Sequence, residues 1–329
     1  MSIDTKFLNL FIKATEKAAI GASKYIGKKD KIGADKGAVD PMRRELNKIN
    51  MEGTIVIGEG EMDEAPMLYI GEKLGTLNGP KFDIAVDPLE GTKFTANNQP
   101  NAFSVIAVAK KGDLLSAPDT YMEKIVIGNN LPKNFLDLDY GVEKNIRLLA
   151  KEKNKKIKDM NVCVMKRPRH DKIVKKLTDL GVTINYITDG DIAGALSVIG
   201  KKPKNDIYYS TGGGPEGVLA AAALSCYGGQ IQGRLVLNDE EKIRAKKLGI
   251  KDFSKKYDIN DIAPSEYTIV EKKFKNKKGF LETYYSTQKF IDFEKKMSDK
   301  IINMYYSIDY DIPIKTDYDE NDIDNFISG

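Results

Sequence analysis

Apolar residues recur along the chain with two different periods, and each period predicts a different kind of element. Between residues 7 and 22 they return every three to four positions, which is typical of an amphipathic helix. Short β-branched apolar runs at 54–57 and 82–86 predict buried strands. A polar loop follows the helix predicted between residues 7 and 22. Asp40 and Pro41 then predict the N-cap and the first residue of a second helix, which would run to Leu46.

Strands and helices alternate further along the chain. Residues 104–109 and 114–115 flank a Lys-Lys-Gly-Asp turn and predict a hairpin. A polar, lysine-rich segment follows, with one surface helix near 142–154. The later elements predicted by periodicity are strands at 162–165, 182–187 and 207–209 and helices at 173–180 and 218–224.

This alternation predicts an α/β fold, because strands that alternate with helices build layered sheets. We place a boundary in the polar segment and expect two lobes, residues 1–155 and 156–329. After about residue 252 the pattern becomes irregular, with a basic run at 272–278 and an acidic tail at 317–324. Both runs are typical of solvated surface.

Composition excludes several classes of protein. The net charge is +4, from 52 basic and 48 acidic residues, and the lysine clusters lack interleaved aromatics, so nucleic acid is not an expected partner. No apolar stretch reaches the ~18 residues of a membrane helix, and the first residues do not form a signal peptide. Cys163 and Cys226, the two cysteines, cannot form a disulfide framework. We expect a soluble, cytoplasmic protein.

The single histidine restricts the metal chemistry. His170 alone cannot build a histidine-rich zinc site, and two cysteines cannot build a thiolate site. Any bound metal must therefore have oxygen ligands, which favours Mg²⁺ or Mn²⁺. His170 itself is expected to be a surface or capping residue, since it follows a basic loop at a helix entry.

Acidic or glycine residues follow the predicted strands. After the strand at 82–86 come Asp87-Pro88-Leu89-Glu90-Gly91-Thr92, where two carboxylates can bind a cation and the Gly-Thr backbone can bind an anion. This pairing suggests metal-assisted chemistry on a phosphate. The other loops of this kind contain Asp35, Glu59, Asp189-Gly190-Asp191, and Gly213 with Glu216.

Each loop also has a purely structural interpretation. Asp35 can be a polar turn residue, the 87–92 segment a helix cap, and the 189–191 segment a turn that caps the next helix. The glycines at 212–214 can be a flexible linker. Arg167 and Arg169 can serve a helix entry, or they can bind phosphate, which guanidinium groups match in a bidentate manner.

Considered together, these segments resemble one family. The matching segments are residues 31–35, Gly-Thr-Ile-Val-Ile-Gly-Glu-Gly-Glu at 53–61, Asp-Glu-Ala-Pro-Met-Leu-Tyr-Ile-Gly-Glu at 63–72, the 87–92 motif, Ala-Pro-Asp-Thr-Tyr-Met-Glu-Lys at 117–124, Arg-Pro-Arg-His at 167–170, the 189–191 motif and Gly-Gly-Gly-Pro-Glu-Gly-Val at 212–218. They resemble the class II fructose-1,6-bisphosphatases, members of the lithium-sensitive sugar phosphatase superfamily. The likeness runs to about residue 252, after which an Ala-Thr-Gly-Val-Thr-Asp-Gly-like segment is missing.

The resemblance implies a layered α/β sugar-phosphatase fold, a homo-oligomer (dimer or tetramer), and hydrolysis of the 1-phosphate of fructose 1,6-bisphosphate with Mn²⁺ or Mg²⁺. The implied catalytic residues are Thr92, Lys31, Asp35 and Glu59. The implied metal ligands are Asp35, Glu59, Asp87, Glu90 and Glu216. The implied substrate contacts are Glu90, Gly91, Thr92, Tyr121, Arg167, Pro168, Arg169, Asp189, Gly190, Asp191 and Gly213.

Three alternatives stay open from the sequence. One is a related metal-dependent phosphatase that acts on sedoheptulose 1,7-bisphosphate or an inositol phosphate. A second is a non-catalytic, metabolite-binding relative. A third is nucleic-acid binding by the lysine clusters, which the nearly neutral charge balance disfavours.

Overall fold

Two six-stranded sheets organise the chain in a computed structural model, which describes residues 5–58, 67–99, 101–200, 202–264, 268–274 and 281–285. All of these ranges lie in one structural unit, Met1–Ser286. The described residues are built into helix and strand layers, so the predicted α/β fold class is confirmed.

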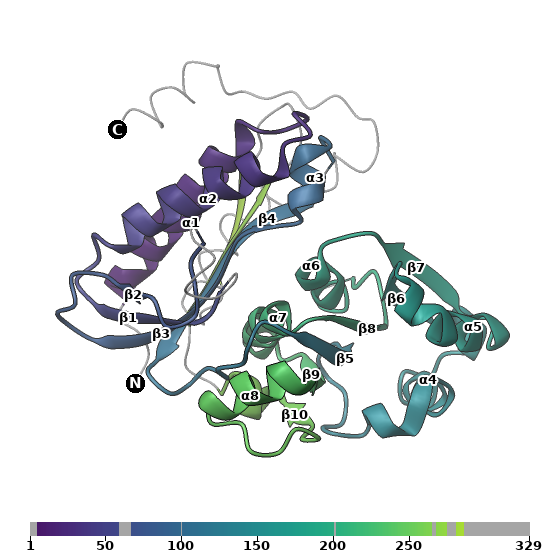
Figure 1. Cartoon of the computed structure of the whole chain (residues 1–329). Helices are drawn as coiled ribbons and strands as arrows, with labels where there is room; N and C mark the ends of the chain where they lie inside the picture. The colour runs from purple at the N-terminus through teal and green to yellow at the C-terminus, as the bar shows by residue number, and fades with distance from the viewer. Residues whose placement is uncertain are drawn as a thin grey trace. The chain divides into compact units, whose positions relative to one another are not determined.

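The first sheet has the strand order β12-β11-β4-β3-β1-β2 (Figure 1). Strands β1 and β3 are parallel, and the other neighbours are antiparallel. Its strands are β1 (Glu52–Ile57), β2 (Lys73–Leu74), β3 (Lys81–Glu90), β4 (Ala102–Lys110), β11 (Thr268–Phe274) and β12 (Leu281–Tyr285).

The second sheet has the order β10-β9-β5-β8-β6-β7. Parallel β6, β7 and β8 form one half, and antiparallel β5, β9 and β10 form the other. Its strands are β5 (Tyr121–Ile127), β6 (Asn161–Met165), β7 (Thr183–Ile187), β8 (Ile207–Gly213), β9 (Gln230–Val236) and β10 (Tyr257–Asp258). Strands β1–β4 belong to the first sheet and β5–β10 to the second, and the chain returns to the first sheet with β11 and β12. The lobes proposed on either side of residue 155 stay a prediction.

Helices cover the faces of both sheets (Figure 1). Helices α1 and α2 pack together on the first sheet, and α7 contacts strands of both sheets. The helices are α1 (Thr5–Ser23), α2 (Lys31–Leu46), α3 (Thr92–Ala96), α4 (Gly141–Glu152), α5 (Asp171–Asp179), α6 (Asp191–Leu196), α7 (Gly214–Tyr227), α8 (Asp239–Lys247) and α9 (Ile259–Ile262), with short 3₁₀ turns η1 (Leu138–Tyr140), η2 (Ile157–Asp159) and η3 (Pro168–His170).

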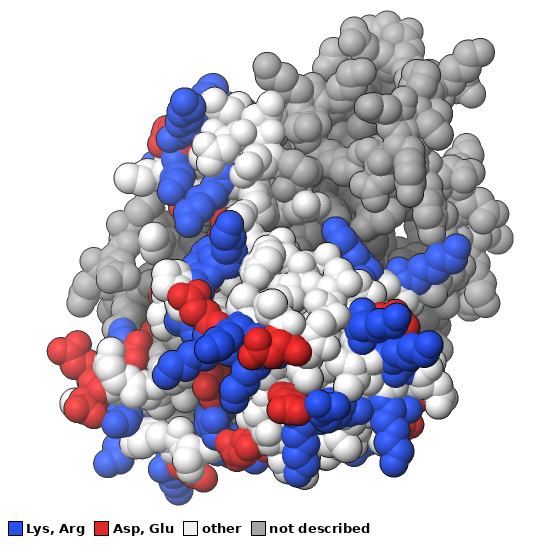
Figure 2. Space-filling model, turned by 90° about the vertical axis from the view of Figure 1, so that its right-hand side faces the viewer, with Lys and Arg blue, Asp and Glu red and all other residues white. Residues whose placement is uncertain are grey.

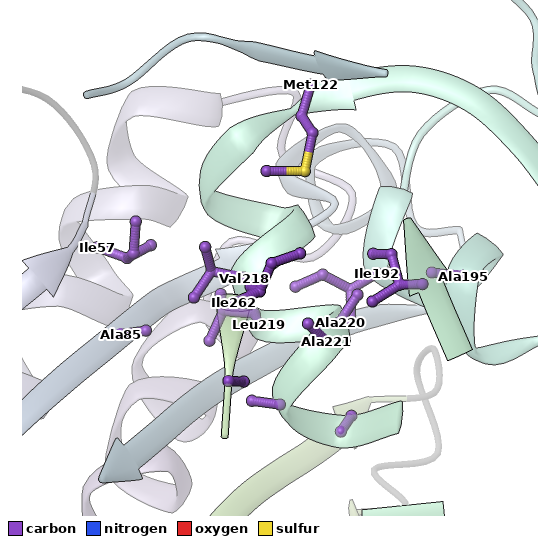
Figure 3. Packing of buried hydrophobic residues seen from close by; sticks show 14 of the residues in the cluster. Ile57, Ala85, Met122, Ile192, Ala195, Val218, Leu219, Ala220, Ala221 and Ile262 are labelled. Carbon is purple, nitrogen blue, oxygen red and sulfur yellow. The ribbon is translucent and has the colours of Figure 1, made fainter. Parts of the chain in front are cut away.

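Helix α7 is the centre of the core between the sheets (Figure 3). Residues 217–224 of the helix are all apolar and buried, which is typical of a helix segment that is packed all round. The alanines at 220–223 are small enough to let both sheets approach, and Val218 and Leu219 pack in the cluster that also holds Ile57 and Met122. A second cluster on the outer face of the second sheet contains residues of α4 and α5, such as Ile146 and Leu177.

The helix predicted to begin at Pro41 begins ten residues earlier. Asp30 caps α2 by accepting a hydrogen bond from Gly33 N, and Pro41 lies inside the helix. A proline there cannot donate to the Gly37 carbonyl. That carbonyl faces Gly21 of α1 so closely that a Cβ at Gly21 would lie 1.8 Å from its oxygen. The sequence prediction was wrong because the contact with α1 accommodates the unbonded carbonyl.

The predicted hairpin after residue 104 was also wrong. Strand β4 ends at Lys110 and pairs with β3 and β11, whereas Leu115 donates a backbone hydrogen bond to Ile262 O at the end of α9. The second apolar pair is therefore held by a distant helix. The predicted opening helix and the strand–helix–strand unit of β6, α5 and β7 are confirmed. The Ala-rich helix is confirmed with an earlier start, at Gly214.

Charges of both signs are interspersed on the face shown in Figure 2. Among the ion pairs of the described residues, Arg234 pairs with Glu123 and Asp139, and Lys256 pairs with Asp137 and Asp139. Within the described ranges, no helix is both long and apolar enough to cross a membrane.

Candidate active site

Three carboxylates converge from two elements that are distant in sequence. Asp87 and Glu90 belong to β3, and Glu216 belongs to the first turn of α7. One oxygen from each lies within 4.8 Å of the others, and Asp87 and Glu90 are buried while Glu216 is half-buried. Such close carboxylates repel one another unless a proton or a cation lies among them.

An irregularity in β3 puts the first two carboxylates together. Residues three apart in a regular strand point to opposite faces. Here Asp87 pairs with Val105 and Glu90 with Phe103, so three steps along β3 match two steps along β4. This is the geometry of a β-bulge, which turns both side chains to one side. Leu89 N stabilises the bulge by donating to Asp87 Oδ1 at 3.0 Å. The predicted turn after residue 86 is therefore a bulged continuation of the strand.

The electrostatics of the group favour a cation. Burial, and then the charge of Glu216, raise the pKa of Glu90 to about 8. Burial, followed by the charge of Asp191, raises the pKa of Glu216 to about 7. Glu90 also makes a hydrogen bond to Asp87, and two carboxyl groups can share such a bond only through a proton. A divalent cation would replace that proton and remove the repulsion.

The donor set fits a hard metal ion. Asp87, Glu90 and Glu216 offer only carboxylate oxygens, which Mg²⁺ and Mn²⁺ accept as ligands. The side chains are also partly fixed before any ion binds, because Glu90 Oε1 accepts a hydrogen bond from Ile192 N at 2.9 Å. The described part of the chain thus contains an acidic group that could hold a metal.

Thr92 and Asp35 form a polar pair next to this group. Thr92 opens α3 two residues after Glu90, and its hydroxyl donates to Asp35 Oδ1 of α2 at 2.8 Å. Burial raises the pKa of Asp35, although the hydrogen bond from Thr92 acts to lower it. Gly91 adopts a left-handed φ of 77°, which starts α3 directly after β3 and leaves the first N–H groups of the helix without helical partners.

A second set of predicted residues gathers at the ends of the second sheet. The Arg169 guanidinium stacks over the Tyr121 ring at 4.5 Å and donates through Nε to Thr211 O at 2.9 Å. Arg167, next to Pro168 of η3, donates to Thr188 O at 2.7 Å, and its guanidinium lies 3.6 Å from Asp189. The arrangement leaves cationic and aromatic groups at an exposed surface, since Tyr121 is 50% exposed.

Phe94 connects the two sets of loops, although no sequence pattern singled it out. Gly190 has a φ of 79°, and a Cβ there would lie 3.2 Å from the Phe94 ring. A Cβ at Gly91 would lie 2.7 Å from the same ring. Both glycines therefore provide room for Phe94, which brings the start of α3 against the start of α6.

Two predicted residues are more buried than expected. Asp191 is 4% exposed. Its Oδ2 accepts a hydrogen bond from Lys124 and its Oδ1 accepts one from Tyr208, so its side chain is directed inward. His170 is fully buried rather than on the surface, because its Nδ1 bonds to Met165 O and its Nε2 accepts from Thr211 N. Burial lowers the pKa of His170, which keeps the imidazole neutral as a link between β6 and β8.

The remaining predicted residues are less constrained by the structure. Glu59 lies outside the described residues. Lys31 opens α2 one turn before Asp35 and is exposed. Gly213 ends β8 as the N-cap residue of α7, and a Cβ there would lie 1.7 Å from Glu216 Oε2. The glycine is thus needed for space, so that the Glu216 carboxylate can fold back over the backbone.

Lys124 is a buried residue of this region that the sequence interpretation left without a role. It lies on β5, where Met122, Lys124 and Val126 share one face. Both flanking residues belong to the core between the sheets. Alternation along the strand could therefore have indicated that this lysine is buried.

The raised pKa values predict how the metal-free protein responds to pH. Glu90 and Glu216 bind protons more tightly when folded than at their ordinary pKa of 4.5, so the free energy of unfolding should decrease as pH rises toward 8. His170 has the opposite effect near pH 6, but above pH 7 its imidazole is neutral in both states. We expect a loss of about 1 kcal/mol between pH 7 and 8.

Urea unfolding of the chelator-treated protein measures this effect. The decrease in the free energy of unfolding between pH 7 and 8 should be smaller in Glu90→Gln. Mn²⁺ should raise the free energy of unfolding more at pH 8 than at pH 6. A metal-free protein whose stability rises from pH 7 to 8 would show that the carboxylates do not repel one another.

Comparisons with known proteins agree with this arrangement. A family model described as bacterial fructose-1,6-bisphosphatase, glpX-encoded, matches residues 6–272, which extends past the predicted limit near 252. Class 2 fructose-1,6-bisphosphatase of Haemophilus influenzae is 47% identical over 70% of this chain and 69% of its own. Fructose-1,6-bisphosphatase 1 class 2 of Escherichia coli is 41% identical over 79% and 81%.

Among solved structures, an extragenic suppressor from Pyrococcus furiosus aligns over 59% of this chain and 70% of its own, with 16% identity. Its TM-score of 0.31 is too low to support any inference. The assignment rests on the sequence relatives and on the family match, which spans more than half of the chain. By these matches the chain belongs to the family of glpX-encoded bacterial fructose-1,6-bisphosphatases.

Proposed function

We propose that this protein is a phosphoric monoester hydrolase that removes the 1-phosphate of fructose 1,6-bisphosphate, giving fructose 6-phosphate and phosphate. The observation that carries the proposal is the convergence of Asp87, Glu90 and Glu216 in a chain of this family. A divalent cation, Mn²⁺ or Mg²⁺, would neutralise phosphoryl oxygens and acidify a bound water. Asp87, Glu90 and Glu216 would hold it, with Asp35 and Glu59 as further proposed ligands.

The protein groups around the cluster have distinct proposed roles. Thr92 donates its hydroxyl proton to Asp35, which leaves its oxygen lone pairs free to accept a hydrogen bond from the attacking water. Asp35 would thereby orient the water through Thr92. The N–H groups of Gly91 and Thr92, at the start of α3, would hold the scissile phosphate, and Lys31 at the start of α2 would approach it.

The loops at the second sheet would recognise the rest of the substrate. Arg167 and Arg169 would bind the distal phosphate, because guanidinium groups match its oxygens in pairs, and Pro168 between them would contact the substrate without donating a hydrogen bond. Tyr121, stacked under Arg169, would pack against the sugar. Asp189, Gly190 and Gly213 would border it, since they lie at the ends of β7 and β8 on the same side as these arginines.

Phosphate release from three substrates tests the proposal. Fructose 1,6-bisphosphate, sedoheptulose 1,7-bisphosphate and inositol 1-phosphate are each assayed with Mn²⁺, with Mg²⁺ and with chelator. We expect the highest kcat/KM for fructose 1,6-bisphosphate and no release with chelator. A preference for either other substrate would reassign the specificity, and no release from any of them with Mn²⁺ would support a non-catalytic, metabolite-binding protein.

Arg169→Ala should separate substrate binding from chemistry. The side chain is proposed to contact the phosphate that is not cleaved, so its loss should raise KM by roughly 10-fold or more and change kcat less. Arg147→Ala is the matched control, because Arg147 pairs with Glu143 on α4 in an exposed i,i+4 bridge. An Arg169→Ala effect confined to kcat would contradict the assignment.

A cytoplasmic location and a homo-oligomer stay predictions from the sequence.

A further inference from the structure

A lysine is buried directly behind the candidate metal centre. Lys124 is 1% exposed, and its Nζ donates to Asp191 Oδ2 at 2.5 Å and to Gly213 O at 2.7 Å. Tyr208, also fully buried, donates its hydroxyl to Asp191 Oδ1 at 2.5 Å. The three side chains come from β5, α6 and β8, so they join three elements in one polar network.

This network borders the carboxylate cluster through the glycine-rich segment before α7. Lys124 binds the carbonyl of Gly213, and the Glu216 carboxylate lies against the same residue. The Asp191 carboxylate lies against Gly212, where a Cβ would be 1.7 Å from Oδ2. Residues 212–213 thus form a thin backbone layer between the lysine and the cluster. Lys124 and Glu216 thus both contact Gly213, which brings the charge of the lysine close to the cluster.

Such a network is costly for a structural purpose alone. Removing an ammonium and a carboxylate from water costs several kcal/mol for each ion, and a packed apolar pair of similar volume is often at least as stable. Gly217 reinforces the point, because a Cβ there would lie 2.6 Å from Met122 Sδ and 3.3 Å from Lys124 Cδ. Gly212, Gly213 and Gly217 therefore leave space for the side chains of the network and of the cluster.

The network also changes the role of Asp191. Its two oxygens already accept hydrogen bonds from Lys124 and Tyr208, and the residue is 4% exposed. Because the residue is 4% exposed, its carboxylate presents little surface to the hydroxyls of a sugar. If Lys124 were absent, Asp191 would become an uncompensated carboxylate near Glu216 and Glu90, since it lies against Gly212 beside Gly213 and its neighbour Ile192 donates to Glu90.

We propose that Lys124 is the resident counter-ion of the metal centre, a positioning residue that ties Asp191 into the interior and sets the net charge that a bound cation experiences. The inference rests on the proposed metal-dependent function. Tyr208 supports it by holding the second oxygen of Asp191. The consequence is a cluster that binds a divalent cation less tightly than its carboxylates alone would, while keeping Asp191 from competing for the cation.

Mn²⁺ titration calorimetry of the metal-free, full-length protein tests this proposal without substrate. Lys124→Met removes a positive charge near the cluster and should lower the Kd for Mn²⁺ by about 10-fold. Asp191→Asn removes a negative charge and should raise the Kd by a similar factor. The double variant restores the wild-type net charge, so its Kd should return to within about threefold of wild type.

Lys155→Met is the matched control. Lys155 binds both oxygens of buried Asp206, which precedes β8 at the end of the strand opposite to Gly213. The Kd of the Lys155→Met protein for Mn²⁺ should equal that of the wild type. If Lys124→Met does not fold, the step from Asp191→Asn to the double variant isolates the lysine charge, because no unpaired Asp191 carboxylate is then present.

Unchanged or weaker Mn²⁺ binding in Lys124→Met, or in the double variant relative to Asp191→Asn, would overturn the proposal and make the network a structural ion pair. Phosphate release by the wild-type protein provides a separate readout. The wild type and its variants could bind Mn²⁺ in the predicted order of affinities while the wild-type protein releases no phosphate. That result would contradict the proposed function and leave the counter-ion role intact.

Discussion

Asp87→Asn is expected to lower kcat for phosphate release by roughly 10³-fold, the largest loss that we expect from a single substitution in this protein. The asparagine keeps an oxygen that can accept from Leu89 N, so the bulge of β3 should persist. The change removes one negative charge from the three that face the cation. The cation would then be held by two carboxylates, Glu90 and Glu216, with weaker affinity and poorer placement.

Stability measurements distinguish this loss from unfolding. The metal-free Asp87→Asn protein should be at least as stable as the wild type, because fewer carboxylates repel one another. Asp83→Asn is the control, since Asp83 is also buried on β3 but accepts a hydrogen bond from Gly112 N away from the cluster. Near-wild-type turnover in Asp87→Asn at saturating Mn²⁺ would remove Asp87 from the set of ligands.

Gly213→Ala is expected to weaken Mn²⁺ binding by 10-fold or more and to lower kcat/KM by roughly 10²-fold at limiting metal. The backbone of Gly213 has φ −66° and ψ 143°, which alanine adopts without strain. The added methyl group would instead meet the Glu216 carboxylate at 1.7 Å. Because the side chain of Glu216 is flexible, it should move out of the cluster while the fold stays intact.

Gly214→Ala provides the comparison for this variant. A Cβ at that neighbouring position would lie 3.1 Å from Thr120 O and would not touch a carboxylate of the cluster. Gly214→Ala should alter thermal stability slightly and keep the Kd for Mn²⁺ within about twofold of the wild-type value. Equal losses of Mn²⁺ affinity in both variants would show that the start of α7, rather than the Glu216 side chain, is the sensitive feature.

Local sequence patterns predicted the elements that depend on local physics. The β-branched runs became β1 and β3, and the apolar period of residues 7–22 became α1. The motif at 87–92 begins inside β3, which continues to Glu90, so the strand end predicted at residue 86 was four residues too early. Pro41 was misinterpreted because its tolerance inside α2 depends on Gly21 in another helix, which no local pattern reveals.

The geometry of the candidate site depends on long-range contacts, so the sequence could only suggest it. Lys124 and Asp191 are 67 positions apart in the sequence. Each is a residue type that usually lies on a solvated surface, so no local pattern indicated that they pair in the interior. Likewise, the glycines at 212 and 213 suggested a flexible linker, whereas the structure uses them to make room for carboxylates. Which side chains need that room becomes clear only when β8, α6 and α7 are placed together.

Anomalous X-ray scattering from crystals of the full-length protein grown with Mn²⁺ tests the central claim most directly. Data recorded on both sides of the manganese absorption edge locate the ion without reference to activity. We predict the strongest peak among the carboxylate oxygens of Asp87, Glu90 and Glu216, with no such peak in Asp87→Asn crystals under the same conditions. A peak only at other residues, in a protein that releases phosphate with Mn²⁺, would contradict the claim.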